Sequence, residues 1–292
     1  MSSKFGGQAL IEGIMIRGAS RAAVVVRKED GTFIQRIYNT NPWALGKIRN
    51  IPILRGLVVL VDTLVIGTKA LNFSAYVSTE DLDIELYEEK KQSPWAVIPV
   101  VVFSFAFAIG IFFIVPIIIS ELFEGLGASS LITNAIEGIL RLLFLIAYIW
   151  LISFSKEIQR VFQYHGAEHM AVAAYEHNED LEIKNLKKYP TEHPRCGTSF
   201  LITIFVIALI IFMFFPREPV WFLVASRLIL IPLLVAISYE IIRLSGNNEN
   251  SFLFKIISWP GILLQKLTTK KPTDDQLDLA IQCMKLAIKE NK

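Results

Sequence analysis

Four histidines lie within 29 residues of this sequence, at positions 165, 169, 177 and 193. The first two belong to the segment His165-Gly166-Ala167-Glu168-His169. If this segment is helical, residues four apart share one face, and both imidazoles can bind one ion. The order His-x-x-Glu-His also matches a zinc-enzyme pattern in which the glutamate is the general base. We therefore predict that His165 and His169 bind a divalent metal, with zinc the first choice, and that Glu168 activates a water there.

A catalytic zinc usually has three protein ligands and one open position, so a third ligand is needed. Three residues are candidates. Glu176 is eleven residues beyond His165 and falls on the same helix face. His193 and Cys196 lie in the downstream loop His193-Pro194-Arg195-Cys196-Gly197, where an imidazole and a thiolate are three residues apart.

Two other interpretations of this group stay open. Cys196 and a histidine are the residue types of a nucleophile pair, and the whole group could be a polar cluster that only holds helices together. Arg195 is suited to hold a carboxylate or a phosphate. His177 precedes Asn178-Glu179-Asp180 and is interpreted as the start of a solvated loop, not as a ligand.

The composition indicates that these residues are carried by a membrane protein. Apolar types make up 53% of the 292 residues and charged types only 19%, whereas about a quarter of a soluble domain is charged. The fold class expected is an all-α multi-pass membrane protein with about four transmembrane helices. A bilayer-spanning helix needs about 20 apolar residues, and the candidate spans are Trp95–Ile119, Leu131–Phe154, Ser199–Phe215 and Val220–Ile242. The second span is expected to continue out of the membrane as the helix that carries the histidines.

Basic residues set the orientation, because cytoplasmic loops are enriched in lysine and arginine. Twelve lie in residues 1–94, six in the loop 154–198 and eight in residues 243–292. Both termini and this loop are therefore placed in the cytoplasm. The terminal regions flank a transmembrane part at 95–242, and the loop connects two spans within that part. Within that part, Arg227 and Glu137 are suited to pair. The net charge of +2 excludes a strongly basic nucleic-acid binder.

The cytoplasmic parts give weaker patterns. Arg21–Tyr38 is expected to form a β-hairpin around Asp30-Gly31, and the glycine-rich residues 6–13 an irregular segment packed on the bundle. Residues 51–70 are interpreted as an interfacial or re-entrant helix, not a fifth crossing. Phe252–Leu267 is expected to lie on the membrane face. A capping box at Thr273 opens an amphipathic helix in which Cys283 serves packing.

Four motifs taken together resemble the YqhQ family. They are Gly6–Gly13, Phe162–His169, His193–Phe200 and Ser238–Arg243, and the resemblance covers residues from about 5 to 290. The resemblance implies a bacterial protein of the cytoplasmic membrane, built around a domain of unknown function and described as a metal-dependent enzyme. Met170 departs from the pattern, because lysine is expected at that place.

These patterns predict a metal-dependent membrane hydrolase. It would act at the cytoplasmic face on a peptide or lipid delivered by the bilayer. The alternative is a non-catalytic membrane scaffold or assembly factor that binds another membrane protein or the protein-insertion machinery. The two differ in their partners, although both are in contact with the lipid bilayer and neither needs nucleic acid.

Overall fold

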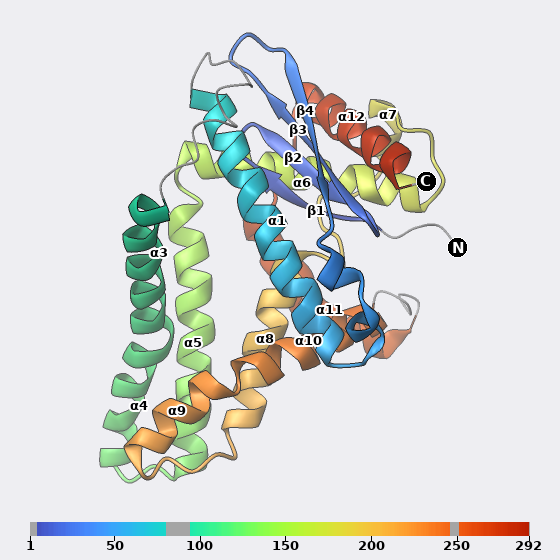
Figure 1. Ribbon diagram of the computed structural model, residues 1–292. Helices are drawn as coiled ribbons and strands as arrows, with labels where there is room; N and C mark the ends of the chain where they lie inside the picture. Colours follow the sequence, from blue (N-terminus) through green and yellow to red (C-terminus); the bar gives the residue numbers. More distant parts are fainter. Residues whose placement is uncertain (1–4, 80–93, 246–250, 292) are drawn as a thin grey trace.

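The protein combines a bundle of apolar helices with a layer made of a β-sheet and helices, shown below and above in Figure 1. The computed structural model describes residues 5–79, 94–245 and 251–291. Residues 80–93 and 246–250 lie outside this description. They adjoin the two boundaries expected for the transmembrane part, at residues 94/95 and 242/243.

The sheet is an antiparallel meander of four strands in the order β1-β2-β3-β4. The predicted hairpin is confirmed as its second half, β3 (Arg21–Arg27) with β4 (Phe33–Asn39). The prediction of an irregular segment at residues 6–13 is wrong. The glycines there belong to β1 (Gly6–Leu10) and to the start of β2 (Gly13–Arg17).

Two of the three glycines in these strands, Gly7 and Gly13, allow close backbone approach. A Cβ on Gly7 would lie 2.6 Å from the carbonyl oxygen of Met15, and one on Gly13 equally close to that of Val25. A side chain at either position would force the strands apart, since real Cβ atoms are not found at such distances. The glycine density therefore marks a tightly packed sheet.

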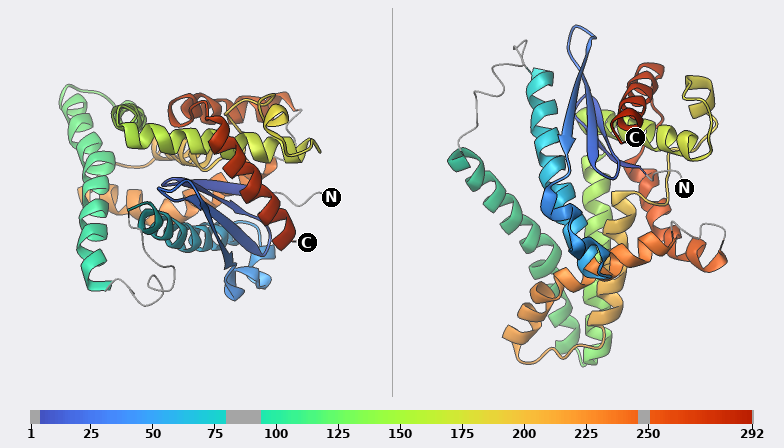
Figure 2. Two further views of the ribbon diagram at one scale, coloured as in Figure 1. Left: turned by 90° about the horizontal axis from the view of Figure 1, so that it is seen from above. Right: turned by 45° about the vertical axis from the view of Figure 1, so that its right-hand side comes forward.

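Helices cover both faces of the sheet (Figure 2). On one face α12 (Asp274–Glu290) and α6 (Lys156–Glu176) bury alternate residues such as Ile14 and Ile16, and on the other α1 (Leu54–Thr79) buries Met15. Side chains of a strand alternate between faces, so one strand serves two cores. The capping box expected at the start of α12 is present, with Thr273 and Gln276 as its partners, and Cys283 is fully buried in the core.

The helix expected at residues 51–70 is therefore α1, which runs on to Thr79 and packs along the sheet and α10. Two short 3-10 turns, η1 (Pro42–Leu45) and η2 (Lys47–Asn50), lead into it.

The apolar helices of the bundle are α3 (Pro94–Ile109), a π-helical turn at Gly110–Ile114, α4 (Val115–Gly125), α5 (Ser130–Ile152), α8 (Gly197–Phe212), α9 (Val220–Ile229) and α10 (Ile231–Ser245). In the part of the chain that the structure describes, two stretches are long and apolar enough to cross a membrane, Val102–Gly125 and Ser130–Ile152. A third is added if α9 and α10, which are bent by 41°, count as one.

Four spans were expected, and the difference has local causes. Helix α8 has 16 residues, about 24 Å at 1.5 Å per residue, which is less than a bilayer core of about 30 Å. The fourth expected span breaks at Leu230. Pro232 follows, and it lacks an N–H while its ring clashes with the carbonyl of the residue four before it.

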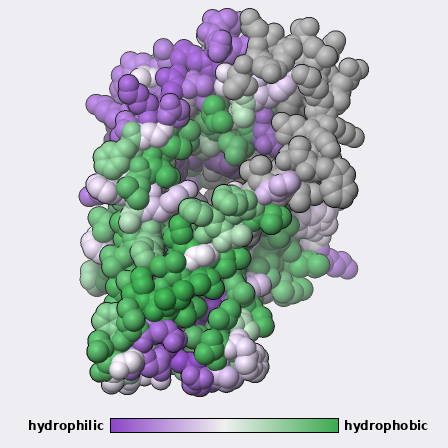
Figure 3. All heavy atoms as spheres, turned by 90° about the vertical axis from the view of Figure 1, so that its left-hand side faces the viewer, coloured by the Kyte–Doolittle hydropathy of each residue, from purple (hydrophilic) through white to green (hydrophobic). Residues whose placement is uncertain are grey.

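The two spans are apolar on the outside. Only 12% of the most apolar window of the first stretch is buried within the protein, and 28% of that of the second. Figure 3 shows the resulting hydrophobic surface over the lower part of the molecule, below a hydrophilic upper part. A surface of this kind needs a cover other than water.

Buried charges hold the far end of the bundle together. The expected pair is present, with Arg227 Nε 3.1 Å from Glu137 Oε1. Glu137 also binds Arg141 at 2.5 Å and Arg217 at 2.9 Å. Glu137 thus links α5 to α9 and to the segment between α8 and α9.

The helix with the paired histidines does not continue the second span. Helix α5 ends at Ile152, and α6 begins at Lys156 after Ser155, whose hydroxyl accepts a hydrogen bond from the Ile158 N–H. Such N-capping starts a new helix, and α6 lies across the top of the bundle (Figures 1 and 2). The short helix α7 (Ile183–Leu186) and helix α11 (Phe252–Thr268) complete the described elements.

Candidate metal centre

The paired histidines lie where α6 is crossed by two other segments, the loop before α8 and the end of α11. Gly166 makes this crossing possible. A Cβ on Gly166 would lie 2.4 Å from the carbonyl oxygen of Lys270 and 3.1 Å from Thr191 Cγ2. The glycine, which costs about 1 kcal/mol of helix propensity against alanine, is therefore explained by packing.

Three side chains meet at this crossing. His165 Nε2 lies 3.1 Å from Cys196 Sγ, and the ring centroids of His165 and His169 are 4.3 Å apart. One potential ligand atom from each of these three residues lies within 4.8 Å of the others. The structure thus brings Cys196, one of the three candidates for the third ligand, to the paired histidines.

Main-chain carbonyls orient both imidazoles. His165 Nδ1 is 2.8 Å from the Thr268 oxygen, and His169 Nδ1 is 2.6 Å from the Thr191 oxygen. A carbonyl can only accept a hydrogen bond, so each Nδ1 carries the proton and each Nε2 keeps its lone pair. This is how histidine ligands are held in metal sites. Burial, which outweighs the opposing effect of a hydrogen bond to the Cys196 sulfur, lowers the pKa of His169 below its usual value and favours the neutral ring.

Cys196 is held at the N-terminus of α8 as its capping residue. Its sulfur accepts a hydrogen bond from the Thr198 N–H at 3.4 Å and lies 3.1 Å from the Thr198 hydroxyl. The N-terminal end of a helix favours negative charge, which suits a thiolate ligand.

Glu168 lies beside the three side chains and is buried under the sheet. Its Oε2 is 3.8 Å from His169 Nε2. A Cβ on Gly7 of β1 would lie 2.7 Å from Glu168 Cδ, so the glycine leaves room for the carboxyl group. Burial raises the pKa of Glu168 above its usual value, and the nearby His165 and His193 oppose this only in part. A raised pKa makes a carboxyl group a stronger proton acceptor, which suits a general base.

His193 and Glu176 form a neighbouring cluster with Arg195. His193 Nε2 lies 3.2 Å from Glu176 Oε2, and its Nδ1 accepts a hydrogen bond from the Arg195 N–H at 3.3 Å. The Arg195 guanidinium also binds Glu176. His193 and Glu176, two of the three candidates for the third ligand, therefore bind each other. The imidazole centroid of His193 lies 5.7 Å from that of His169. Arg195, expected to hold a carboxylate or phosphate, holds the Glu176 carboxylate.

The sequence did not indicate the groups that support this site. The carbonyls of Thr191 and Thr268 have no side-chain signature. Gln265 is fully buried, and its side chain forms two hydrogen bonds with the His193 main chain, accepting from the N–H at 2.7 Å and donating to the carbonyl at 2.9 Å. Its amide beside the apolar residues Ile262, Leu263 and Leu264 is a sequence signal for this role. His177 is exposed, as expected for a solvated position. Its Nδ1 lies 2.8 Å from the Ala173 oxygen, and its ring centroid lies 4.9 Å from that of Tyr189.

The donor set fits a zinc-like ion. Two neutral imidazoles and a thiolate are ligands that zinc accepts. Bonds of about 2.0 and 2.3 Å at a tetrahedral angle place a nitrogen and a sulfur ligand roughly 3.5 Å apart, close to the 3.1 Å between His165 Nε2 and Cys196 Sγ. No ion is part of the structure, so these distances describe the residues alone.

Comparison with known proteins places the chain in a family. The profile of a family described as "Protein of unknown function (DUF1385)" matches residues 51–290, a range that includes every member of both clusters. The chain belongs to the DUF1385 family. The "Uncharacterized protein YqhQ" of Bacillus subtilis (strain 168) is 35% identical over 290 residues, covering 95% of this chain and 90% of the relative. This confirms the expected resemblance. No solved structure matches the chain.

Proposed function

We propose that this DUF1385 protein is a metal-dependent membrane hydrolase with its site at the cytoplasmic face. One observation carries the proposal. His165 and His169 each present Nε2 toward Cys196, and a main-chain carbonyl fixes each imidazole in the tautomer that binds metal. In this tautomer both Nε2 lone pairs are left to bind a metal.

The residues around this group suit hydrolysis. A divalent ion bound by the three side chains would act as a Lewis acid and lower the pKa of a water molecule. Glu168 would accept the proton of that water at Oε2, the oxygen 3.8 Å from His169 Nε2, and return it to the leaving group. The His193–Glu176–Arg195 cluster would hold the loop that carries Cys196 against α6.

The surroundings favour a substrate that the bilayer delivers. The exposed apolar surface of the bundle supports insertion in a membrane, and the distribution of lysine and arginine favours the cytoplasmic side for the layer above it. The candidate site lies between that layer and the bundle. A membrane-associated peptide or lipid would reach it sideways.

Metal content tests the proposal. Protein purified in detergent is incubated with zinc, desalted and analysed by mass spectrometry for metal. We expect about one equivalent in the wild type, as a single site of this donor set predicts. The His165→Ala/His169→Ala variant should elute as the same folded species without metal, and His177→Ala serves as the matched control that keeps it.

Glu168→Gln separates the two parts of the proposal. This variant should bind zinc as the wild type does and lose hydrolysis of fluorescent casein or phosphatidylglycerol. A wild type that holds no zinc would overturn the proposal and favour the scaffold, in which case a membrane-protein partner should co-purify with the wild type and with His169→Ala alike.

A further inference from the structure

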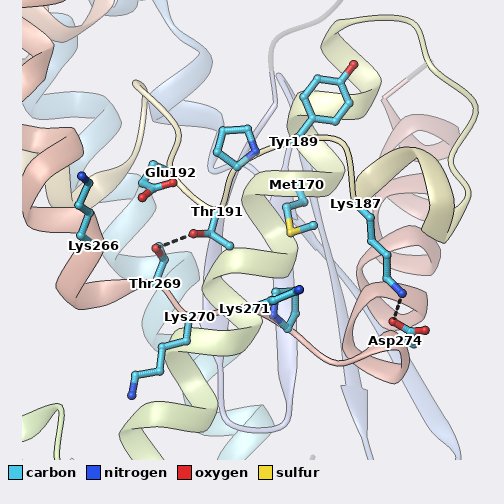
Figure 4. A pocket seen from close by; sticks show the side chains of 12 residues that line it. Met170, Lys187, Tyr189, Thr191, Glu192, Lys266, Thr269, Lys270, Lys271 and Asp274 are labelled. Carbon is cyan, nitrogen blue, oxygen red and sulfur yellow. Dashed lines mark hydrogen bonds and ion pairs between the residues drawn. The ribbon is translucent and has the colours of Figure 1, made fainter.

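A basic cavity of about 570 Å³ lies on the other side of the loop that holds His169. Its lining includes four lysines and two carboxylates, an excess of two positive charges. Figure 4 labels the lysines, Lys187, Lys266, Lys270 and Lys271, and the carboxylates, Glu192 and Asp274.

The charges are unevenly distributed around the cavity. Lys187 Nζ is 2.6 Å from Asp274 Oδ1, which neutralises that pair. Lys266, Lys270 and Lys271 come from the end of α11 and the residues after it. The Thr269 hydroxyl already binds the Gln265 carbonyl at 2.9 Å, so these lysines are not needed to cap the helix. Their combined charge favours an anionic ligand.

An exposed apolar stripe on helix α11 ends at this cavity. Its positions 252, 256, 259, 263 and 266 follow steps of three and four, so they share one face. The first four are large apolar residues exposed to between 47% and 79%, namely Phe252, Ile256, Trp259 and Leu263. The fifth is Lys266 of the cavity. An apolar stripe that ends in positive charge matches an amphiphile with an anionic head.

A second exposed apolar group lies at the same level of the molecule. It belongs to η1, η2 and the start of α1, next to α10 and α11 (Figures 1 and 2). Its members are Trp43, Leu45, Ile48, Ile51 and Leu54. Tryptophan at such a boundary is typical of the membrane interface. Both groups therefore favour a bilayer as the cover of this level.

The cavity shares two segments with the candidate metal centre. Thr191 lines the cavity, while its carbonyl holds His169 Nδ1. Thr269 also lines it, and its hydroxyl lies 3.1 Å from that of Thr191, while the preceding carbonyl, of Thr268, holds His165 Nδ1. A ligand in the cavity would touch the segments that orient both imidazoles.

We infer that this cavity binds the phosphate of an anionic phospholipid, whose acyl chains lie along the apolar stripe of α11. Lys266, Lys270 and Lys271 bind the phosphate oxygens. The inference deepens the proposed function, because it places a lipid headgroup next to the candidate metal centre. What this lipid does at the centre rests on the proposed function. Lipid binding itself needs no metal.

Native mass spectrometry of the detergent-solubilised full chain tests the inference. Phosphatidylglycerol and phosphatidylcholine with the same acyl chains are added at equal concentration. We expect the wild type to bind phosphatidylglycerol at least about tenfold more tightly, since lysines near a lipid surface attract anionic lipids over zwitterionic ones. Lys266→Gln/Lys270→Gln/Lys271→Gln should lose this preference. Lys69→Gln/Lys285→Gln/Lys289→Gln removes the same charge from exposed lysines elsewhere and should keep it.

Two further arms decide between sources of phosphate and between proposals. Inorganic phosphate in tenfold excess over the lipid should leave phosphatidylglycerol bound, and displacement would assign the cavity to a soluble phosphate and overturn the inference. Equal binding of both lipids by the wild type, or an unchanged preference in the Lys266 triple variant, would also overturn it. The His165→Ala/His169→Ala variant should keep the preference, so loss of metal and loss of lipid binding can be told apart.

Discussion

Glu137→Gln is expected to destabilise the bundle strongly, because this carboxylate is shared by three arginines. Its distances to Arg141, Arg217 and Arg227 are 2.5, 2.9 and 3.1 Å, and Glu137 itself is 1% exposed. Removing one partner of a buried ion pair costs about 3–5 kcal/mol, because the other charge stays buried without compensation. With about 2–4 °C of melting temperature per kcal/mol for a chain of this size, we expect a fall of roughly 10 °C.

Glu124→Gln is the matched control. Glu124 binds the same Arg217 at 2.6 Å, but its side chain is 37% exposed, and exposed ion pairs contribute about 0–1 kcal/mol. Both variants would be heated in the same detergent, and the folded fraction followed by fluorescence-detected gel filtration. The reasoning would be refuted if Glu137→Gln melted within about 2 °C of the wild type, a shift of at most about 1 kcal/mol, or if both variants lost the same amount.

Three further predictions concern the site. Gly166→Ala should cost about 1–3 kcal/mol of stability by overpacking, since its Cβ would lie 2.4 Å from the Lys270 oxygen. Gly110→Ala, with open space around it, should not have this cost. Equal melting temperatures of the two variants would contradict the prediction. Burial raises the pKa of Glu168, so metal-free wild type loses stability as the pH rises from 4.5 through the raised pKa. Glu168→Gln, measured by melting in EDTA, should therefore be the more stable protein at pH 8, with a gain that vanishes toward pH 4.5; a less stable variant at pH 8 would disprove the sign. Burial also raises the pKa of the Cys283 thiol well above its usual range, so maleimide should reach Cys283 only after denaturation. In metal-free folded protein maleimide should modify Cys196, and zinc should block this reaction. Labelling of folded Cys196→Ser protein would contradict the prediction.

Much of the helical part could be predicted because its signals are local. The apolar run of α5 and the Thr273 capping box each depend on neighbouring residues, and both are found where expected. The strand β1 was missed for the opposite reason. Its two glycines carry no strand propensity, and Gly7 is explained only by what lies across from it, the Met15 carbonyl and the Glu168 side chain.

The candidate site shows the same division. The spacing of His165 and His169 on one helix predicted that their side chains would meet, whereas the choice among Cys196, His193 and Glu176 depended on how a distant loop returns to α6. That return is fixed by Gln265 and by two carbonyl groups, and a carbonyl is present in every residue. The start of α6 was foreseeable, because Ser155 is a typical N-capping residue.

The position of α12 has a consequence for the order in which the molecule is built. The strands that α12 covers end at residue 27, while α12 begins at residue 274, and its Asn291 side chain closes the arrangement by bonding to the Ser20 and Arg21 main chain. On the ribosome, the apolar helices between them are made while one face of β2 and β3 still lacks its cover. The segment at Thr268 that orients His165 is also made after these apolar helices. The carbonyl that orients His165 therefore joins the centre only once the apolar helices have been made, and the newborn sheet needs protection from aggregation until α12 covers it.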